Sequence, residues 1–288
     1  MQSTTAPPVA AWRPTAAGLL AATVALGAAL LVPRAFSDPV GVDPFQVRLA
    51  AASLALLGAA ALSTRLLLAR PMLLATASIA APFCLWAAMP RGLAVVAGDR
   101  FSGNQQILAA DIAYLVATLG FVALARWWLS PEARPRIRLG GVSLLAAAVA
   151  VGGSLLLLGI AMALPAPLLG REGIQPISLA RDLPLVGPAF ALQAAAQEAQ
   201  FRGLLLGALE TGLAPWTANL AQATFFGLAH VAVQYEGPAG PFVPLTIALG
   251  LLLGWVTQWT RSLWPAIVIH AVLEVAVAVA ILNGLYGY

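Results

Sequence analysis

The chain has 288 residues, of which 61% are hydrophobic and only 9% charged, and its mean hydropathy is +0.89. A water-soluble domain of this length cannot bury so much apolar surface, so the composition excludes an ordinary soluble protein. The net charge of +4 arises from 15 arginines and 11 acidic residues, without any lysine. We assign this excess to loops between apolar segments, and we predict no nucleic-acid partner.

Apolar segments long enough to span a bilayer recur along the chain, since a membrane helix needs about 20 such residues. Clusters of proline, glycine and charge separate them at 34–48, 91–104, 130–141, 165–184 and 235–241. We predict an all-α, polytopic integral membrane helical bundle of about nine (eight to nine) transmembrane helices, located in the cell membrane. The predicted segments are 16–33, 49–64, 71–90, 106–129, 140–164, 186–209, 216–234, 243–260 and 264–284.

The first segment follows Arg13 but is too long for a secretory signal and lacks a clear cleavage site, so we expect a retained helix. Four arginines, Arg126, Arg134, Arg136 and Arg138, cluster around one loop. By the positive-inside rule this loop is cytoplasmic, which with nine spans places the N-terminus inside. Arginines in the other loops are nearly balanced, so the orientation stays open.

Ionisable residues are unevenly distributed among the apolar segments. The first five segments contain almost none in their interiors, and we expect the exception, Asp111, to cap or pack near a helix end. Cys84 is the only cysteine, so no intramolecular disulfide forms. We predict N-terminal accessory transmembrane helices at 1–139, a connecting helix and loop at 140–185, and a core at 186–284 that carries the function.

The core contains three groups of polar residues, and the first is Glu198 with Arg202. Charged residues inside membrane helices are costly and usually face a partner or a cavity, which makes them functional candidates by default. Four residues apart, acid before base, these two share one helix face and favour an ion pair. The pair has one of two roles. It either only neutralises the two charges so that both side chains can lie inside the bilayer, or it orients the carboxylate beside a functional site.

The other two groups contain the only histidines of the chain. Gln222, Phe226 and His230 are spaced by four along one helix face, and so are His270 and Glu274 on another. In a purely structural role, His230 would form a hydrogen bond with a backbone carbonyl of a neighbouring helix, and His270 and Glu274 would form a hydrogen-bonded pair. Three such helices close together in the chain favour a common site instead.

Taken together, these residues resemble the CPBP family of membrane proteins, which includes the type II CAAX prenyl endopeptidases. The family pattern is E-E-x-x-x-R, then F-x-x-x-H, then H-x-x-x-N or D. Gln197-Glu198 to Arg202 resembles the first motif with its F-R-G ending, Phe226 to His230 the second, and His270 to Glu274 the third. The resemblance implies an intramembrane glutamic endopeptidase in which glutamate activates water, one histidine holds it, and the second-motif histidine with the third-motif Asn stabilises the oxyanion.

Two positions depart from the family pattern. Gln197 replaces the first glutamate, which is usually taken as the general base, and Glu274 replaces the third-motif Asn. An amide cannot accept a proton as a base at ordinary pH. One hypothesis is that Gln197 and Glu274 have exchanged roles, with Glu274 as the base beside His270 and the Gln197 amide donating to the oxyanion.

Several alternatives remain open at this stage. Gln197 could mark an inactive relative with an immunity, scaffold or regulatory role, or an engineered change that traps a substrate. An ion or proton-coupled transporter would also place charged residues inside membrane helices. We predict no cofactor, although His230, His270 and Glu198 would supply three ligands if zinc were bound. The expected partners are the lipid bilayer and a membrane-embedded or lipid-anchored peptide or protein substrate.

The depths of the two histidines are harder to reconcile. His230 lies roughly 20 Å from a helix start near Thr217, whereas His270 lies roughly 9 Å from Trp264 on a helix that runs the same way. The rings approach each other only if the first of these helices begins lower, tilts strongly, or is short and ends in a cavity.

Overall fold

Helices make up most of the described part of the chain, which in this computed structural model comprises residues 55, 56, 58, 69–97, 100–141, 143–163, 179–230 and 239–285. Within these ranges there is no β-strand, only an isolated bridge between Leu139 and Ser262. The all-α prediction is confirmed for this part of the chain. The elements are α3 (Ala69–Ala97), α4 (Gly103–Trp128), η2 (Pro131–Ala133), α5 (Leu144–Ala163), α6 (Leu179–Glu198), η4 (Ala199–Leu205), α7 (Leu206–Leu209), α8 (Pro215–Ala229), α9 (Ala239–Thr260) and α10 (Trp264–Leu285).

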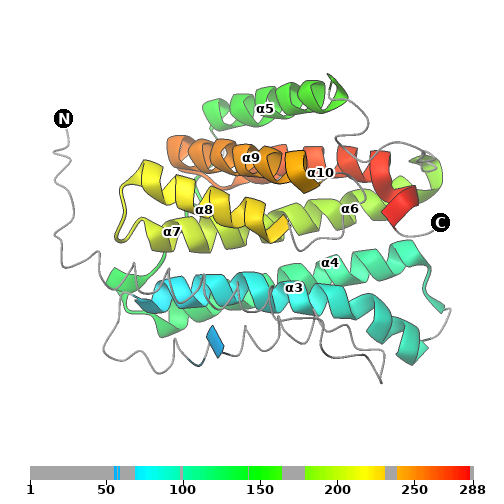
Figure 1. The fold of residues 1–288 in the computed structure, drawn as a ribbon, viewed down its shortest axis with the longest axis horizontal. Coiled ribbons are helices and arrows are strands. Elements are labelled where there is room, and N and C mark those ends of the chain that lie inside the picture. The colour runs from blue at the N-terminus through cyan, green and yellow to red at the C-terminus, as the bar shows by residue number, and fades with distance from the viewer. Residues whose placement is uncertain are drawn as a thin grey trace.

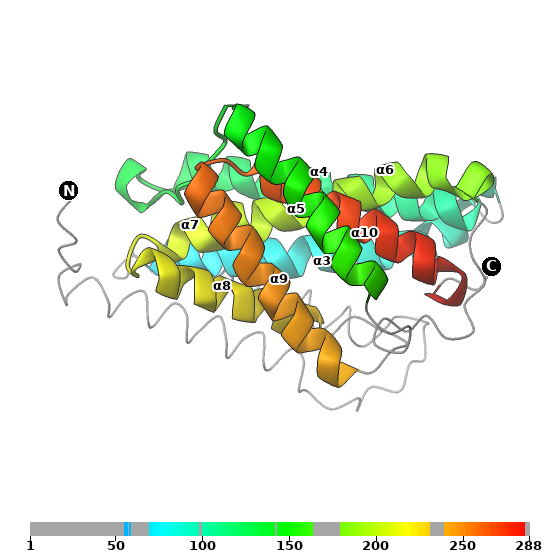
Figure 2. The same cartoon turned by 90° about the horizontal axis from the view of Figure 1, so that it is seen from above.

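The helices stack in layers (Figure 1), and α5 and α9 cross the other helices obliquely (Figure 2). The antiparallel pair α3 and α4 forms one outer layer, and α5 forms the opposite one. Between them lie α6 to α8 and then α9 and α10, with α6 in contact with both α4 and α10. The segment from α6 to α7 is therefore central, and residues that it carries are shielded by helices on both sides.

The relative offset of α8 and α10 brings the two histidines into the same region. Both helices run in the same direction, but α8 starts nearer one end of the bundle than α10 does (Figure 2). The end of α8, where His230 is the C-terminal cap, thus lies beside the early turns of α10. We predicted several ways in which the two histidines could reach the same depth. In the structure α8 begins nearer the end of the bundle and is short, and both features contribute.

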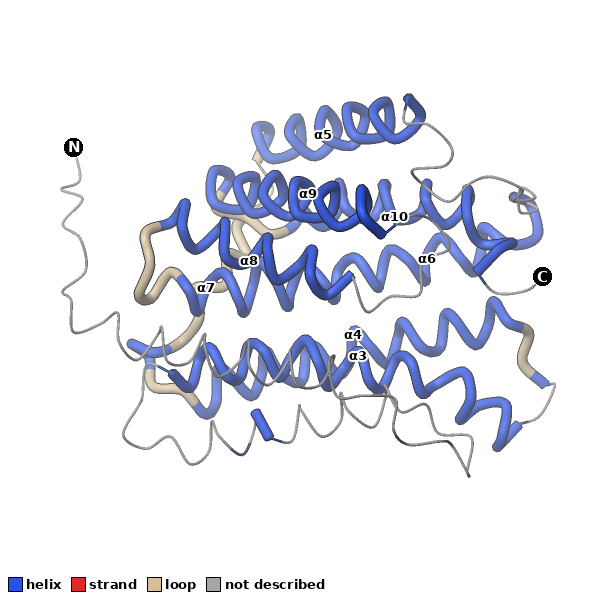
Figure 3. The backbone as a smooth tube through the Cα atoms, viewed as in Figure 1, coloured by secondary structure: helices blue, strands red, loops and turns tan. Residues whose placement is uncertain are grey.

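The observed helix bounds differ from the predicted ones in places (Figure 3). Helix α6 begins at Leu179, inside the stretch 165–184 that we predicted as a loop, and it contains Pro184 and Pro188. Helix α8 ends at Ala229, short of the predicted end at 234. The predicted segment 16–33, and all but three residues of 49–64, lie outside the described residues.

Two of the described helices are long and apolar enough to cross a membrane, Gly103–Trp128 and Val243–Thr260. Two further apolar helices, Leu144–Ile160 and Trp264–Ala276, are shorter. The structure therefore supports membrane-spanning helices in the described part of the chain, and the nine-span topology stays a prediction.

Small residues allow α8 and α9 to pack closely. A methyl group added at Gly250 would meet the Cα atom of Ala223 at 3.0 Å, and one added at Gly254 would overlap the Asn219 side chain. Close approach through small residues is a common way for membrane helices to associate. Here it brings backbone carbonyls of α9 within reach of polar side chains from α8 and η4.

The connection between α4 and α5 is fixed to the helix that carries the first motif. A Cβ added at Gly207 would lie 2.7 Å from the backbone nitrogen of Arg136, and one added at Gly203 would contact Ile137. On its other side the connection is held by a hydrogen bond of 2.8 Å from the Leu263 amide to the Arg138 carbonyl. Only glycine at position 207 leaves room for this backbone contact.

Candidate active site

The first motif lies where an α-helix changes into a π-helix. Helix α6 ends at Glu198, and η4 continues the same helical path with π-type hydrogen bonds, such as that from the Leu206 amide to the Phe201 carbonyl five residues earlier. All seven residues of η4 are buried. Isolated π-helical turns often occur at functional sites because they change the direction of the side chains that follow.

Glu198 and Arg202 form the predicted ion pair at the centre of the bundle. The Nη1 atom of Arg202 donates to Oε1 of Glu198 over 2.8 Å, and both side chains have 0% exposure. The Nη2 atom donates to the Gly250 carbonyl at 3.3 Å, and the guanidinium lies over the Phe226 ring, 4.3 Å from its centre. The cation is thus held by a carboxylate, a backbone carbonyl and an aromatic face.

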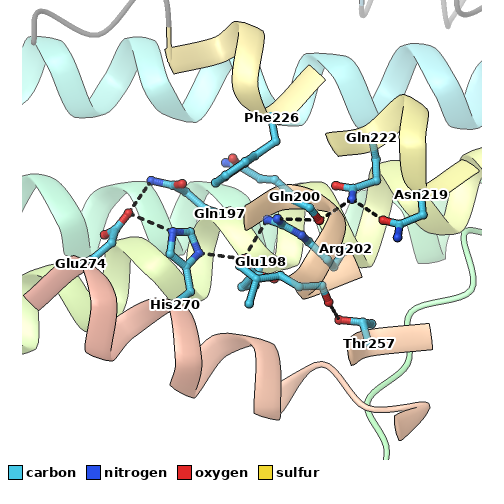
Figure 4. A network of polar contacts seen from close by, with 12 residues as sticks. Gln197, Glu198, Gln200, Arg202, Asn219, Gln222, Phe226, Thr257, His270 and Glu274 are labelled. Atoms are coloured by element: carbon cyan, nitrogen blue, oxygen red, sulfur yellow. Dashed lines mark hydrogen bonds and ion pairs between the residues drawn. The ribbon is translucent and has the colours of Figure 1, made fainter. Parts of the chain in front are cut away.

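His270 connects this pair to a second carboxylate (Figure 4). Its Nδ1 atom lies 2.7 Å from Oε1 of Glu198, and its Nε2 atom lies 3.2 Å from Oε1 of Glu274. Because an ionised carboxylate only accepts hydrogen bonds, both ring nitrogens donate when both glutamates are ionised, and the ring is then positive. The predicted pair of His270 and Glu274 exists, but it is not isolated.

Gln197 completes the network on the side away from Arg202. Its Nε2 atom donates to Oε1 of Glu274 over 3.2 Å, so that the carboxylate oxygen accepts from both Gln197 and His270. The Glu274 side chain is 17% exposed, in contrast to Glu198. When His270 is protonated, the two carboxylates are balanced by one guanidinium and one imidazolium, which is how a buried charge cluster is tolerated.

His230 and Gln222 lie on either side of Phe226 along α8. The Nδ1 atom of His230 lies 2.7 Å from the Phe226 carbonyl, which can only accept, so this nitrogen carries the proton. The Phe226 ring packs edge-to-face against both imidazoles, with centroid distances of 4.6 Å to His230 and 5.6 Å to His270. Gln222 donates to Asn219 and to the Gly250 carbonyl. All eight predicted site residues therefore belong to one connected region.

Sequence reasoning missed a second set of buried contacts, which ties η4 to α4. The Tyr114 hydroxyl donates to Oε1 of Gln200 over 2.8 Å, and Nε2 of Gln200 donates to Thr118 over the same distance. All three side chains are buried. The signal was present in the sequence, because residues 111, 114 and 118 follow helical spacing along one face of α4.

Our prediction for Asp111 was wrong in its position. The residue is fully buried within α4, well past the capped N-terminus at Ser102, where it lies against α3. Its Oδ1 atom accepts a hydrogen bond of 2.7 Å from the Trp86 indole, while Oδ2 has no partner within the described part of the chain. The indole N–H of the partly buried Trp86, which needs an acceptor, explains why the carboxyl group is tolerated far from the helix end.

The described residues contain no group of three or more His, Cys, Asp and Glu side chains arranged to hold a metal ion. Of the three ligands considered for zinc, His270 and Glu198 are hydrogen-bonded to each other, and His230 is bonded to a backbone carbonyl. The expectation that the site needs no cofactor stays a prediction.

The segment that contains the three motifs is similar to a known protein family. Residues 180–276 match the Rce1-like family of type II CAAX prenyl endopeptidases. The resemblance inferred from the three motifs is confirmed, and this segment is similar to a family of CAAX-protease-like proteins that are embedded in membranes. No curated protein and no solved structure matches the chain.

The matched Rce1-like segment begins and ends close to the predicted core. It covers helices α6 to α9 and the first half of α10, including Gln197, Glu198, Arg202, His230, His270 and Glu274. Helices α3, α4 and α5 lie outside it, yet α4 supplies Tyr114 and Thr118, which contact Gln200. The polar interior of the protein therefore extends beyond the family segment.

Proposed function

We propose that the chain is an intramembrane endopeptidase in which Glu274 activates the attacking water and His270 fixes the orientation of its carboxylate. The observation that carries this proposal is the hydrogen bond between Gln197 and Glu274. In the family pattern these positions hold a glutamate and an asparagine, and here they hold a glutamine and a glutamate. The two side chains are hydrogen-bonded to each other. Exchanging acid and amide therefore moves the negative charge from one side chain to its neighbour and leaves the net charge of the pair unchanged.

Solvent access favours Glu274 over Glu198 as the base. In both carboxylates the Oε2 atom is buried and has no hydrogen-bond partner among the described residues, but the Glu198 side chain has no exposure while the Glu274 side chain is 17% exposed. In addition, Glu198 is directly paired with Arg202, which stabilises its negative charge. A base that must collect a proton from water needs contact with water.

The proposed reaction requires two proton transfers. Glu274 removes a proton from water as the oxygen attacks the scissile carbonyl, which gives a tetrahedral intermediate with an oxyanion. The Gln197 amide is the proposed donor to that oxyanion. Glu274 then returns its proton to the leaving amine as the C–N bond breaks, so the carboxylate is regenerated without a metal or an external acid.

The proposed substrate is a peptide bond of a membrane-embedded or lipid-anchored protein or peptide. The network lies among helices that include the two long apolar ones, so a peptide reaches it from the bilayer or from a membrane surface. We expect no cofactor, and activity in the presence of a chelator tests this expectation.

A peptidase assay with exchanged residues tests the proposal. The purified protein in detergent is incubated with a panel of internally quenched peptides that carry a transmembrane segment or a lipid anchor. We expect Glu274→Gln to lower cleavage at least about 100-fold, in line with the loss of a general base. The double variant Gln197→Glu with Glu274→Asn restores the family pattern and should recover activity.

Other results would reject the proposal in distinct ways. Cleavage that survives Glu274→Gln would exclude Glu274 as the base. No cleavage by the natural chain, together with activity in the double variant, would favour the alternative that Gln197 marks an inactive relative with a regulatory or immunity role. Retained melting temperature in each variant shows that lost activity does not reflect unfolding.

A further inference from the structure

A basic pocket lies at the end of the bundle where α4 finishes, away from the network around His270. It is lined by Ala125, Arg126, Arg134, Pro135 and Ile137 and has a volume of about 210 Å³. Its walls come from the last turn of α4 and from the connection to α5, and they contain two arginines but no acidic residue. A cavity of this size with two cations suits a small anionic group.

Among the residues that the structure describes, the two arginines of this pocket have no acidic partner. Arg126 forms no ion pair with the residues that the structure describes, and Arg134 donates only to the backbone carbonyl of Leu129 at 3.0 Å. Glu132 is exposed in the same connection and acts on Arg134 only through its charge. By contrast, nearby Arg138 is neutralised by Glu210 at 2.7 Å. The positive charge of the pocket is therefore available to a ligand.

The pocket is a preformed site because its loop is held in place from two sides. The close backbone contact at Gly207 fixes Arg136, and the hydrogen bond from Leu263 fixes Arg138. Gly140 has a φ of +27°, and an added Cβ there would lie 2.6 Å from the Arg261 carbonyl. Because the backbone is already fixed, a ligand has to order only the side chains of the two exposed arginines and not the loop itself.

Tryptophans at the same end of the bundle place the pocket at the level of lipid headgroups. Trp127 is 83% exposed beside Arg126, and Trp216 lies exposed at the start of α8. The stacked pair Trp255 and Trp259 lies in the last two turns of α9, which Gln258 joins to the start of α8 by a bond to the Pro215 carbonyl. Tryptophans gather at membrane–water interfaces, and arginines beside them meet the phosphates of anionic lipids.

We propose that this pocket binds the phosphate of an anionic phospholipid, with Arg126 and Arg134 as its ligands. A free phosphate offers the same chemistry to the two guanidinium groups. The lipid is favoured because its acyl chains would lie along the exposed apolar surface next to Trp127, where a free ion gains nothing. This assignment is independent of the proposed peptidase activity.

Lipid binding to the purified protein tests the proposal. Native mass spectrometry in neutral detergent counts bound phosphatidylglycerol and phosphatidylcholine, and thermal unfolding is followed with the same lipids. We expect selective retention of phosphatidylglycerol and a higher melting temperature with it. Arg126→Ala should weaken binding about fivefold and the double variant Arg126→Ala with Arg134→Ala about thirtyfold, since each arginine near an anionic headgroup contributes about 1 kcal/mol.

Matched controls separate this site from general charge effects. Arg100→Ala removes an exposed arginine near the start of α4, at the opposite end, and should leave lipid selectivity unchanged. Equal retention of both lipids by the natural chain, or an equal effect of Arg100→Ala, would overturn the proposal. Inorganic phosphate that matches the stabilisation by phosphatidylglycerol, with the same dependence on Arg126, would show a site for free phosphate and reject the lipid.

Discussion

The two ends of the buried polar network differ in their access to solvent and in the cations that hold them. At the inner end, Glu198 and Arg202 have no exposure and lie among α6, η4 and α9. At the outer end, Glu274 is 17% exposed and accepts from a neutral amide as well as from His270. The inner charges are needed to keep each other buried, whereas the outer carboxylate belongs to a partly exposed side chain and is the proposed base. The same residue type therefore serves stability in one place and is proposed for chemistry in the other.

The largest expected effect comes from removing a charge at the inner end. Glu198→Gln leaves the Arg202 guanidinium buried without a counter-charge, and we expect the free energy of unfolding to fall by about 3 to 5 kcal/mol. Thermal unfolding in detergent measures this loss. The double variant Glu198→Gln with Arg202→Met removes both charges and should recover much of the stability. An unchanged melting temperature in the single variant would mean that the inner pair does not stabilise the fold.

Adding a methyl group at Gly250 tests how the inner end of the network depends on the backbone carbonyl that Arg202 contacts. Gly250→Ala would place its Cβ 3.0 Å from the Cα of Ala223, which forces α8 and α9 apart and moves the carbonyl that Arg202 and Gln222 use. We expect a loss of about 1 to 3 kcal/mol, as for other overpacked interiors. Gly120→Ala is the control, because its added Cβ meets nothing within 4 Å. Equal melting temperatures of the two variants would contradict this role of the helix contact.

The contacts of Gln200 should have a smaller effect. Gln200→Leu removes its hydrogen bonds with Tyr114 and Thr118, and we expect a loss of about 2 kcal/mol, or about 1 for each bond. Tyr114→Phe removes only one of these bonds and should cost about half as much. If Gln200→Leu were as stable as the natural chain, α4 would not be held to η4 through these side chains.

The smallest change in stability is expected at the outer end. Glu274→Gln is the same chemical substitution as Glu198→Gln, but the partly exposed side chain can still accept from His270, so we expect a loss of no more than about 1 kcal/mol. Unfolding of the two glutamine variants side by side gives the direct comparison. A loss at Glu274 equal to that at Glu198 would remove the distinction between the two ends.

Local spacing predicted the contacts within helices, and packing decided the contacts between them. The pairs of Glu198 with Arg202 and of His270 with Glu274 followed from four-residue spacing, and the motifs predicted that all these helices meet. The hydrogen bond between His270 and Glu198 could not be derived, because it depends on the offset between helices from distant parts of the sequence. The same holds for Gln200 and Tyr114.

Local sequence patterns also did not predict where two of the helices begin or end, or that one stretch is a π-helix. The apolar run 216–234 continues past Ala229, so hydropathy gave no sign that His230 would cap the helix. Helix α6 extends back to Leu179 through Pro184, which we predicted as the end of a loop. Nothing in the sequence marks the π-helical turns of η4, since their side-chain pattern is that of any buried helix.

The π-helix has a consequence for how this site tolerates changes in chain length. A π-helical stretch uses more residues per turn than an α-helix, so it behaves like an insertion within a helix whose flanks stay in place. Deleting one residue between 199 and 205 would favour ordinary α-helical turns and rotate everything that follows by about 100° relative to Glu198. Gly203 and Gly207 would then face away from the arginine-rich connection. Chain length in this short stretch thus sets the register between the two functional regions proposed for the molecule.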